Sequence, residues 1–141
     1  MSDKKVLNLG DTLTLEITDI NNLGCGVARH DGLVVFVKGG VSGDTVSAKI
    51  IKLNKSFAVA KLEGIISASP YREAADTACG ERLSCGGCVW RGVSYAHELQ
   101  MKQNYVSAAF AKAGIADATV LPVLCAGKIY RYRNKIGRAH V

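Results

Sequence analysis

The sequence has no long apolar run, and we expect no secretory leader segment. Nowhere does it approach the roughly 20 consecutive apolar residues that a membrane-spanning helix needs, and residues 1–5 lead into polar residues instead of the apolar core of a secretory signal. Internal repeats and low-complexity tracts are absent too. These absences predict a cytoplasmic protein without a membrane partner. Thiols stay reduced in that compartment, so we interpret the five cysteines as metal ligands, nucleophiles or core residues.

Aromatic residues are also scarce, at 6% of the chain, and residues 1–66 contain only Phe36 and Phe57. Hydrophobic residues as a whole reach 48% of the 141 residues, which argues against disorder of the whole chain. The length suits one compact domain, or one small domain with an appendage. We expect the protein to act as a monomer.

Basic charge is concentrated in the second half of the chain. Lys and Arg number eight against seven Asp and Glu up to Pro70, but ten against five from Tyr71 onward, within a formal net charge of +6. Clustered positive charge favours a polyanionic partner. An ordinary solvated surface gives the same pattern, and charge alone does not separate the two interpretations.

The first half of the chain has the pattern of a small all-β barrel. Residues 12–18 alternate between polar and apolar, the period of two that a half-buried strand shows. Turns rich in Gly, Ser and Asn separate the apolar runs. The predicted strands are residues 12–18, 24–29, 33–37, 45–53 and 57–62. Five short strands with glycines at the bends favour a closed barrel of the OB type, because closure hides the sheet edges.

This stretch resembles the TRAM domain, an RNA-binding barrel found in RNA-modifying enzymes. The resemblance is carried by Gly-x-Gly-Val-Ala-Arg at 24–29, Val-Phe-Val-x-Gly-Gly at 35–40, Gly-Asp-x-Val at 43–46 and Phe-Ala-x-Ala at 57–60. It implies an RNA-binding barrel over residues 1–68; Lys38 stands where the family more often has proline. With so few aromatics, we expect weak and largely electrostatic RNA contacts. The candidate residues are Arg29, Lys38, Lys52 and Lys55.

The sharpest pattern is the cysteine motif Cys79-x5-Cys85-x2-Cys88. Three thiolates so close together, with glycines that let the backbone turn, indicate a metal centre. A [4Fe–4S] cluster takes thiolate ligands, normally four, and zinc would also take four, with His97 available as the last. A structural zinc ribbon usually shows two Cys-x-x-Cys knuckles and this chain has one. The spacing therefore favours iron–sulfur over zinc without excluding zinc.

The residues around this motif resemble the RNA uracil-C5 methyltransferases. Cys85-Gly-Gly-Cys88-x-Trp90 leads into Ser-Tyr-x-x-Glu-Leu-Gln-x-Lys-Gln at 94–103. The resemblance implies that Cys79, Cys85 and Cys88 bind a [4Fe–4S] cluster, with the family's fourth cysteine downstream of this chain. Cys125 does not match that fourth position and is expected in a strand. Cys25 is expected in the barrel core, and His97 on the surface.

The same resemblance implies that the chain is the N-terminal part of an enzyme that methylates C5 of uridine with S-adenosylmethionine. A Rossmann-like SAM domain would follow, and it would carry the catalytic residues and the SAM site, so none is assigned here. Family members that act on ribosomal RNA usually carry both the barrel and the cluster. The expected substrate is therefore 23S rRNA, with transfer RNA the less favoured choice.

Two other functions compete with this interpretation. The chain could be a stand-alone RNA-binding TRAM module with a zinc or iron–sulfur appendage. Radical methylthiotransferases also carry a TRAM barrel, but they use Cys-x3-Cys-x2-Cys and place the barrel at the C-terminus. The spacing and order here differ on both counts, so we set that class aside.

One helix is predicted after the cysteine motif, from Ser94 as its N-cap to Gly114 as its stop. Residues 69–116 would then form the cysteine loop and this helix. Residues 117–135 are predicted to begin a β-rich central domain, with strands at 120–124 and 130–135. Tyr-Arg-Asn-Lys at 132–135 begins that domain in the family, and alternating Tyr and Arg suit a strand that faces RNA. This adds three candidate RNA contacts, which are Arg131, Arg133 and Lys135.

The last six residues do not continue the family pattern. Ile-Gly-Arg-Ala-His-Val, residues 136–141, is the translation of ATCGGAAGAGCACACGTC, a string within a common sequencing adapter. Our hypothesis is that these residues are a read-through artefact. Arg138 and His140 are accordingly given no functional role.

Overall fold

The structure is a computed structural model that describes residues 6–73, 88–130 and 137. It divides into two compact units, Met1–Ser94 and Tyr95–Val141, and each is described by itself. None of the helices among the described residues is both long enough and apolar enough to cross a membrane.

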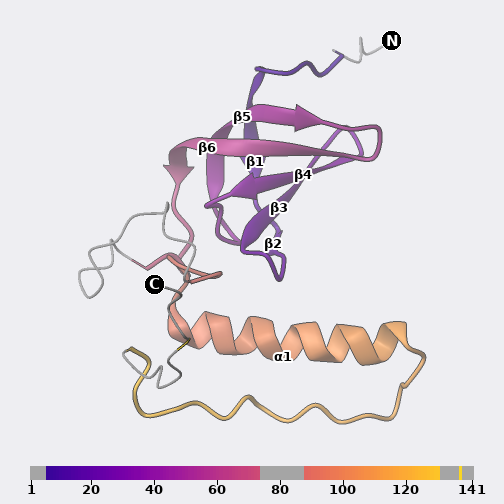
Figure 1. The fold of residues 1–141 in the computed structure, drawn as a ribbon, viewed down its shortest axis with the longest axis vertical. Coiled ribbons are helices and arrows are strands. Elements are labelled where there is room, and N and C mark those ends of the chain that lie inside the picture. Colours follow the sequence, from indigo (N-terminus) through magenta and orange to yellow (C-terminus); the bar gives the residue numbers. More distant parts are fainter. Residues whose placement is uncertain (1–5, 74–87, 131–136, 138–141) are drawn as a thin grey trace. The chain divides into compact units, whose positions relative to one another are not determined.

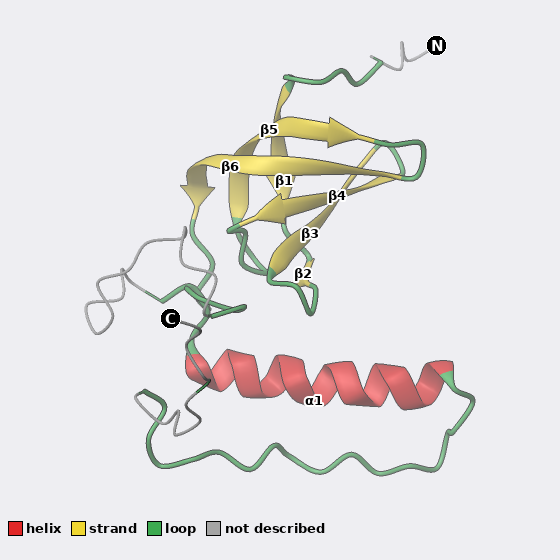
Figure 2. Ribbon diagram, viewed as in Figure 1, coloured by secondary structure: helices red, strands yellow, loops and turns green. Residues whose placement is uncertain are grey.

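The first unit is a small barrel of β-strands (Figures 1 and 2). Its strands are β1 (Thr12–Glu16), β2 (Asp19–Ile20), β3 (Cys25–His30), β4 (Leu33–Lys38), β5 (Thr45–Leu53) and β6 (Phe57–Ser67). They are ordered β1-β5-β6-β4-β3-β2. The β4–β6 pair is parallel and the other four pairs are antiparallel. The OB-like fold predicted from the sequence is confirmed.

The first predicted strand is bent, and this bend closes the barrel. β1 pairs with β5 and β2 pairs with β3, so the strand order begins and ends within one continuous stretch of chain. At the bend the Ile17 amide donates to the Asp44 carbonyl at 2.9 Å, and the Thr18 amide donates to the Val27 carbonyl at 2.8 Å. The chain therefore changes its pairing partner between these two residues, and both edges of the sheet are covered.

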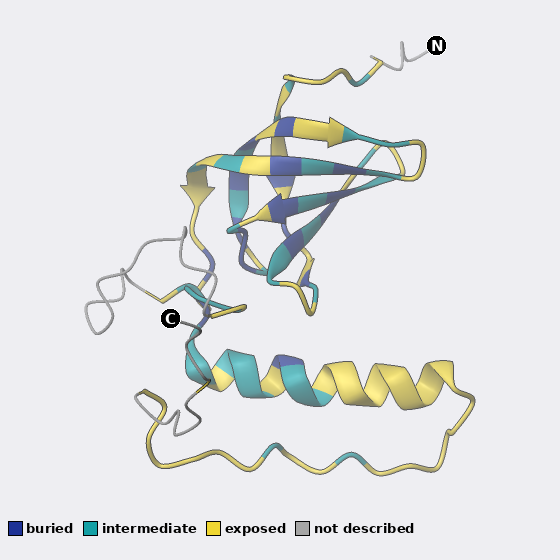
Figure 3. Cartoon of the chain, in the orientation of Figure 1, coloured by how far each residue is buried: buried dark blue, intermediate teal, exposed yellow. Residues whose placement is uncertain are grey.

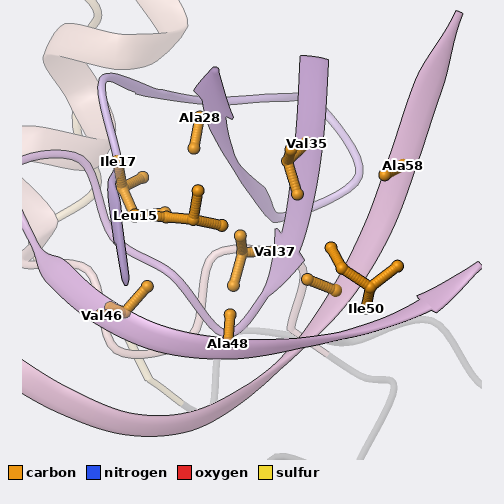
Figure 4. Close-up of a cluster of buried hydrophobic side chains, with 10 residues drawn as sticks. Leu15, Ile17, Ala28, Val35, Val37, Val46, Ala48, Ile50 and Ala58 are labelled. Carbon is orange, nitrogen blue, oxygen red and sulfur yellow. The ribbon is translucent and has the colours of Figure 1, made fainter. Parts of the chain in front are cut away.

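The interior of the barrel is filled by small and branched side chains. Burial alternates along most of β4 and the first half of β6, which places one side chain in the core and the next on the outer face (Figure 3). The inward side chains converge in Figure 4. They are Leu15, Ile17, Ala28, Val35, Val37, Val46, Ala48, Ile50, Ala58 and Ala60. Four of these ten residues are alanines, whose small side chains suit the interior of a small barrel.

The first unit extends beyond the boundary predicted at residue 68. Asp44 lies in the turn before β5, and its side chain is fully buried. Its carboxylate is held by residues before and after the barrel's last strand. It accepts hydrogen bonds from the amides of Val41 and Ser69, both at 2.8 Å, and from the guanidinium of Arg72. Arg72 also donates to the Gly39 carbonyl at 2.8 Å. Residues just after the barrel thus supply the counter-charge for a carboxylate inside it.

The second unit contains the helix α1 (Tyr95–Lys112). It begins directly after Ser94, as predicted. At its end the Gly114 amide donates to the Ala111 carbonyl and the Ile115 amide to the Phe110 carbonyl. Gly114 has a φ of +76°, so this end is a Schellman motif that needs glycine. The predicted stop is confirmed.

The strand predicted at residues 120–124 is wrong. Residues 115–130 contain neither helix nor strand, and Leu121 and Leu124 are exposed. A strand forms only where a neighbouring strand satisfies its backbone hydrogen bonds, and no described strand in this unit offers that edge. Residues 131–135 lie outside the described part, so the start of a central domain at 117–135 stays a prediction.

Replacing Arg72 with Met should lower the free energy of unfolding by about 3–5 kcal/mol, because it leaves a buried carboxylate without its partner. Urea unfolding followed by circular dichroism measures this. Arg29→Met, at an exposed position on the same barrel, is the matched control and should change stability by less than about 0.5 kcal/mol. Equal effects of the two changes would show that the ion pair is not what secures this turn.

Stability should also depend on Asp44 at acid pH. Burial alone would raise the pKa of Asp44, but hydrogen bonds from Arg72, Ser69 and Val41 lower it below the ordinary value of 3.8. A lowered pKa means that the folded state favours the carboxylate, so its contribution is present above pH 3.8 and is lost as the pH falls further. Asp44→Asn should flatten the acid limb of the stability profile below pH 3.8. An unaltered acid limb in Asp44→Asn would refute this.

Candidate nucleic-acid interface and cysteine segment

Three lysines lie side by side on the outer face of the barrel. Lys38 on β4 pairs with Lys61 on β6, and Lys61 pairs with Lys49 on β5. All three are exposed. We call Lys38, Lys61 and Lys49 the lysine row. Neighbouring strands are about 4.8 Å apart, so the row spans about 10 Å across the sheet.

An apolar patch adjoins this row on the same face. Its members are outward-facing, partly exposed residues of β3, β4 and β6: Val27, Val34, Phe36, Phe57 and Val59. Phe36 and Phe57 pack edge to face with ring centroids 5.7 Å apart and an interplanar angle of 63°. We call these five residues the aromatic patch. The two aromatic residues of the barrel are therefore gathered in one place.

The RNA contacts predicted from the sequence lie around the same face. Arg29 on β3 pairs with Val34, and Lys52 on β5 pairs with Val59. Lys55 lies in the turn between β5 and β6, and each of these basic residues is exposed, as is Lys38. Their contact with RNA stays a prediction. Arg131, Arg133 and Lys135 lie outside the described residues.

Lys49 and Lys61 were missed by reasoning from the sequence. Each looks like an ordinary polar residue in an alternating strand. They join Lys38 only because β4 and β6 pair in parallel with a particular register. No local pattern encodes that long-range pairing, although the outward phase of each strand could have been read from its alternation.

The electrostatics of the lysine row are unfavourable for the isolated barrel. Within residues 6–73 and 88–130, no ion pair involves Lys38, Lys49 or Lys61. Like charges directly opposite one another on neighbouring strands are destabilising. The row therefore presents three positive charges that form no ion pair within the described residues.

The described end of the cysteine segment is fastened to the barrel. The indole nitrogen of Trp90 donates to the Asn21 carbonyl at 2.9 Å. Gly24 has a φ of +76°, and a Cβ added there would overlap the carbonyl oxygen of Val89. The loop between β2 and β3 is thus shaped to receive Val89 and Trp90, and only glycine fits at its closest point.

A short stem joins the two sides of the cysteine segment. Arg72 and Val93 form an antiparallel bridge. The Glu73 amide donates to the Gly92 carbonyl at 2.9 Å, and the Ser94 amide donates to the Tyr71 carbonyl at 2.8 Å. Residues 71–73 and 92–94, on the two sides of the cysteine segment, are therefore bonded to each other.

The described cysteines carry free thiols, and two of the predicted environments are wrong. Cys88 is exposed, which leaves its sulfur available as a ligand. Cys25 is partly exposed instead of in the core, because it occupies an outward position opposite Lys38. Cys125 is exposed in a loop instead of a strand. His97 is partly buried on α1.

The metal centre stays a prediction. Cys79 and Cys85 lie outside the described residues, so the geometry of the three-cysteine set is not given. Among the residues that are described, no group of three or more His, Cys, Asp or Glu side chains could hold a metal ion. The donor set known from the sequence, three thiols with one of them exposed, fits either iron–sulfur or zinc chemistry.

A small β-barrel whose outer face combines lysines with aromatic rings has the features of the oligonucleotide-binding barrels. Within that class, residues 7–62 match the family model of the TRAM domain. A solution structure of a conserved protein from Methanococcus maripaludis is 31% identical, covers 45% of this chain and 91% of its own, and has a TM-score of 0.40.

Curated relatives resemble the chain well beyond the barrel. Proteins named as uncharacterized RNA methyltransferases are 40% identical in Gloeobacter violaceus, 37% in Clostridium tetani and 33% in Listeria monocytogenes. These matches cover 89%, 89% and 94% of this chain, but only 28%, 27% and 29% of the relatives. The chain thus spans less than a third of their length.

Replacing Gly24 with Ala should dislodge Trp90, because the added methyl group occupies the position of the Val89 carbonyl. Trp90 is the single tryptophan of the chain, so its fluorescence reports this docking directly, and its emission should shift to the red. Gly32→Ala is the matched control, since Gly32 has a similar φ of +82° but nothing within 4 Å of the added carbon. A red shift in both variants would show general strain instead of a specific contact.

Proposed function

We propose that this chain is the N-terminal part of a SAM-dependent 23S rRNA (uracil-5-)-methyltransferase, to which it contributes RNA binding and a [4Fe–4S] cluster site. One observation carries the proposal: a TRAM barrel and a cysteine segment fastened to it occur in one chain whose relatives are named RNA methyltransferases. A match over 89% of the chain must include residues 79–88 wherever it begins. The aligned region therefore spans residues 79–88 as well as the barrel.

We assign the cluster and the catalytic machinery to different parts of the full-length protein, because the chain covers only part of its relatives' length. Since the chain corresponds to 28% of the first relative's length, we assign the SAM site and the catalytic residues to the remaining part. Cys79, Cys85 and Cys88 would hold the cluster, and when bound it would tie these thiolates into one centre. The cysteines present here are not assigned as the nucleophile.

Methylation at C5 can be tested with the full-length protein of the same gene. A 23S rRNA transcript that carries tritium at uracil C5 should release tritium to water when SAM is added, because methylation at that carbon displaces its hydrogen. Transfer RNA labelled in the same way is the control substrate and should release much less. Methyl incorporation without tritium release would place the reaction on another atom and refute the uracil-C5 assignment.

The cluster can be tested on the present chain by anaerobic reconstitution with iron and sulfide. We expect a brown protein with broad visible absorption, partial occupancy and sensitivity to oxygen, since three thiolates leave one iron without a cysteine. Cys79→Ser, Cys85→Ser and Cys88→Ser should each abolish the colour. Cys25→Ser is the control and should retain it, and loss in Cys125→Ser would identify that thiol as a fourth ligand.

Elemental analysis of the anaerobically purified protein decides between the two metals. Stoichiometric zinc without iron would contradict the cluster. It would favour the alternative function, a stand-alone RNA-binding TRAM module with a zinc appendage, with which a compact unit that ends at Ser94 is also consistent.

A further inference from the structure

We infer that the lysine row and the aromatic patch together form a binding site for single-stranded RNA on the outer face of β3, β4, β6 and β5. This inference rests on the proposed RNA-binding function and deepens it, since it assigns the site and the form of RNA that the site accepts. The inferred site is one continuous surface, whereas the RNA contacts predicted from the sequence are single basic residues.

The charge of the row points to a polyanion. Lys38, Lys61 and Lys49 stand directly opposite one another on three neighbouring strands, an arrangement that costs the free barrel stability. None of the described acidic residues forms an ion pair with them. Phosphates lined up along one nucleic-acid strand neutralise such a row and release counterions, which supplies binding free energy.

The position of the aromatic rings favours a single strand over a duplex. Phe36 is two residues from Lys38 along β4, which is about 7 Å, and it touches Phe57. A base attached to a phosphate at the row can therefore reach a ring face or edge. Stacking requires an exposed base face, which a single strand offers and a duplex hides.

The row also leads toward the cysteine segment. Lys38 pairs with Cys25, the first residue of β3, and Cys25 directly follows the loop that receives Val89 and Trp90. A strand that crosses the row from Lys49 to Lys38 is thereby directed to the place where the cysteine segment is fastened.

The first test compares two double variants with the same change in net charge. Lys49→Gln/Lys61→Gln removes two members of the row, whereas Lys112→Gln/Lys128→Gln removes two exposed lysines of the second unit. Fluorescence anisotropy with a labelled single-stranded 12-nucleotide RNA is measured across salt concentrations. The first variant should weaken binding by on the order of tenfold and reduce the slope of log K against log salt by about 1.4. Equal losses in both variants would overturn the proposed site.

If these lysines had a structural role, replacing them would lower the stability of the barrel. Removing like charges that face one another should leave the barrel as stable as before or more stable. Urea unfolding of Lys49→Gln/Lys61→Gln therefore separates the two roles. Lost binding together with lost stability would overturn the inference, because it would show that the lysines hold the fold.

The second test concerns the form of the RNA and the rings. The same RNA annealed to its complement should bind more weakly than the single strand, and equal or tighter duplex binding would overturn the inference. A single strand that contains 2-aminopurine should change its fluorescence on binding, and Phe36→Leu/Phe57→Leu, which keeps the patch apolar, should abolish that change. A change that persists would exclude the rings as the stacking site.

These outcomes separate the inference from the function on which it rests. If wild-type protein binds none of these RNAs at low salt, the proposed RNA-binding function fails and the site fails with it. If wild-type binding is normal but does not change when the lysine row or the two rings are substituted, the site alone is wrong. The aromatic patch would then indicate contact with another protein surface.

Discussion

One buried carboxylate connects the barrel to the segment that follows it. Asp44 has no exposed side-chain surface, and it is stable as an anion because Arg72 and two backbone amides surround it. Arg72 in turn forms the bridge to Val93. The requirement to neutralise a charge inside the barrel thus fixes where the chain goes after β6.

The same strands supply the core and the outer face. Ala60 and Val37 point inward, and the residues that follow them, Lys61 and Lys38, point outward. Because side chains alternate with a period of two, a slip of one residue in β4 or β6 would bury lysines and expose the core. The lysine row therefore helps to specify the register of the barrel, in addition to any role with RNA.

Features encoded locally could be predicted from the sequence, and features that depend on distant pairing could not. Residues 45–53 were predicted as a strand and form β5 (Thr45–Leu53), while Ser94 and Gly114 correctly mark the ends of the helix because capping chemistry is local. The contact between Asp44 and Arg72 joins residues 28 apart, and no pattern in either neighbourhood predicts it. The strand predicted at 120–124 is wrong because its apolar sequence is a local pattern, whereas a strand also needs a partner strand to pair with.

The stem also bears on the chemistry of the three cysteines. Bridging Arg72 to Val93 closes the loop that contains them while the barrel is folded, so part of the loop-closure entropy is met before any ligand binds. A metal ion or cluster that binds this closed loop, but not the unfolded chain, stabilises the barrel by mass action. The coupling runs in both directions. Loosening the Asp44–Arg72 pair should weaken metal binding, although neither side chain would be a ligand.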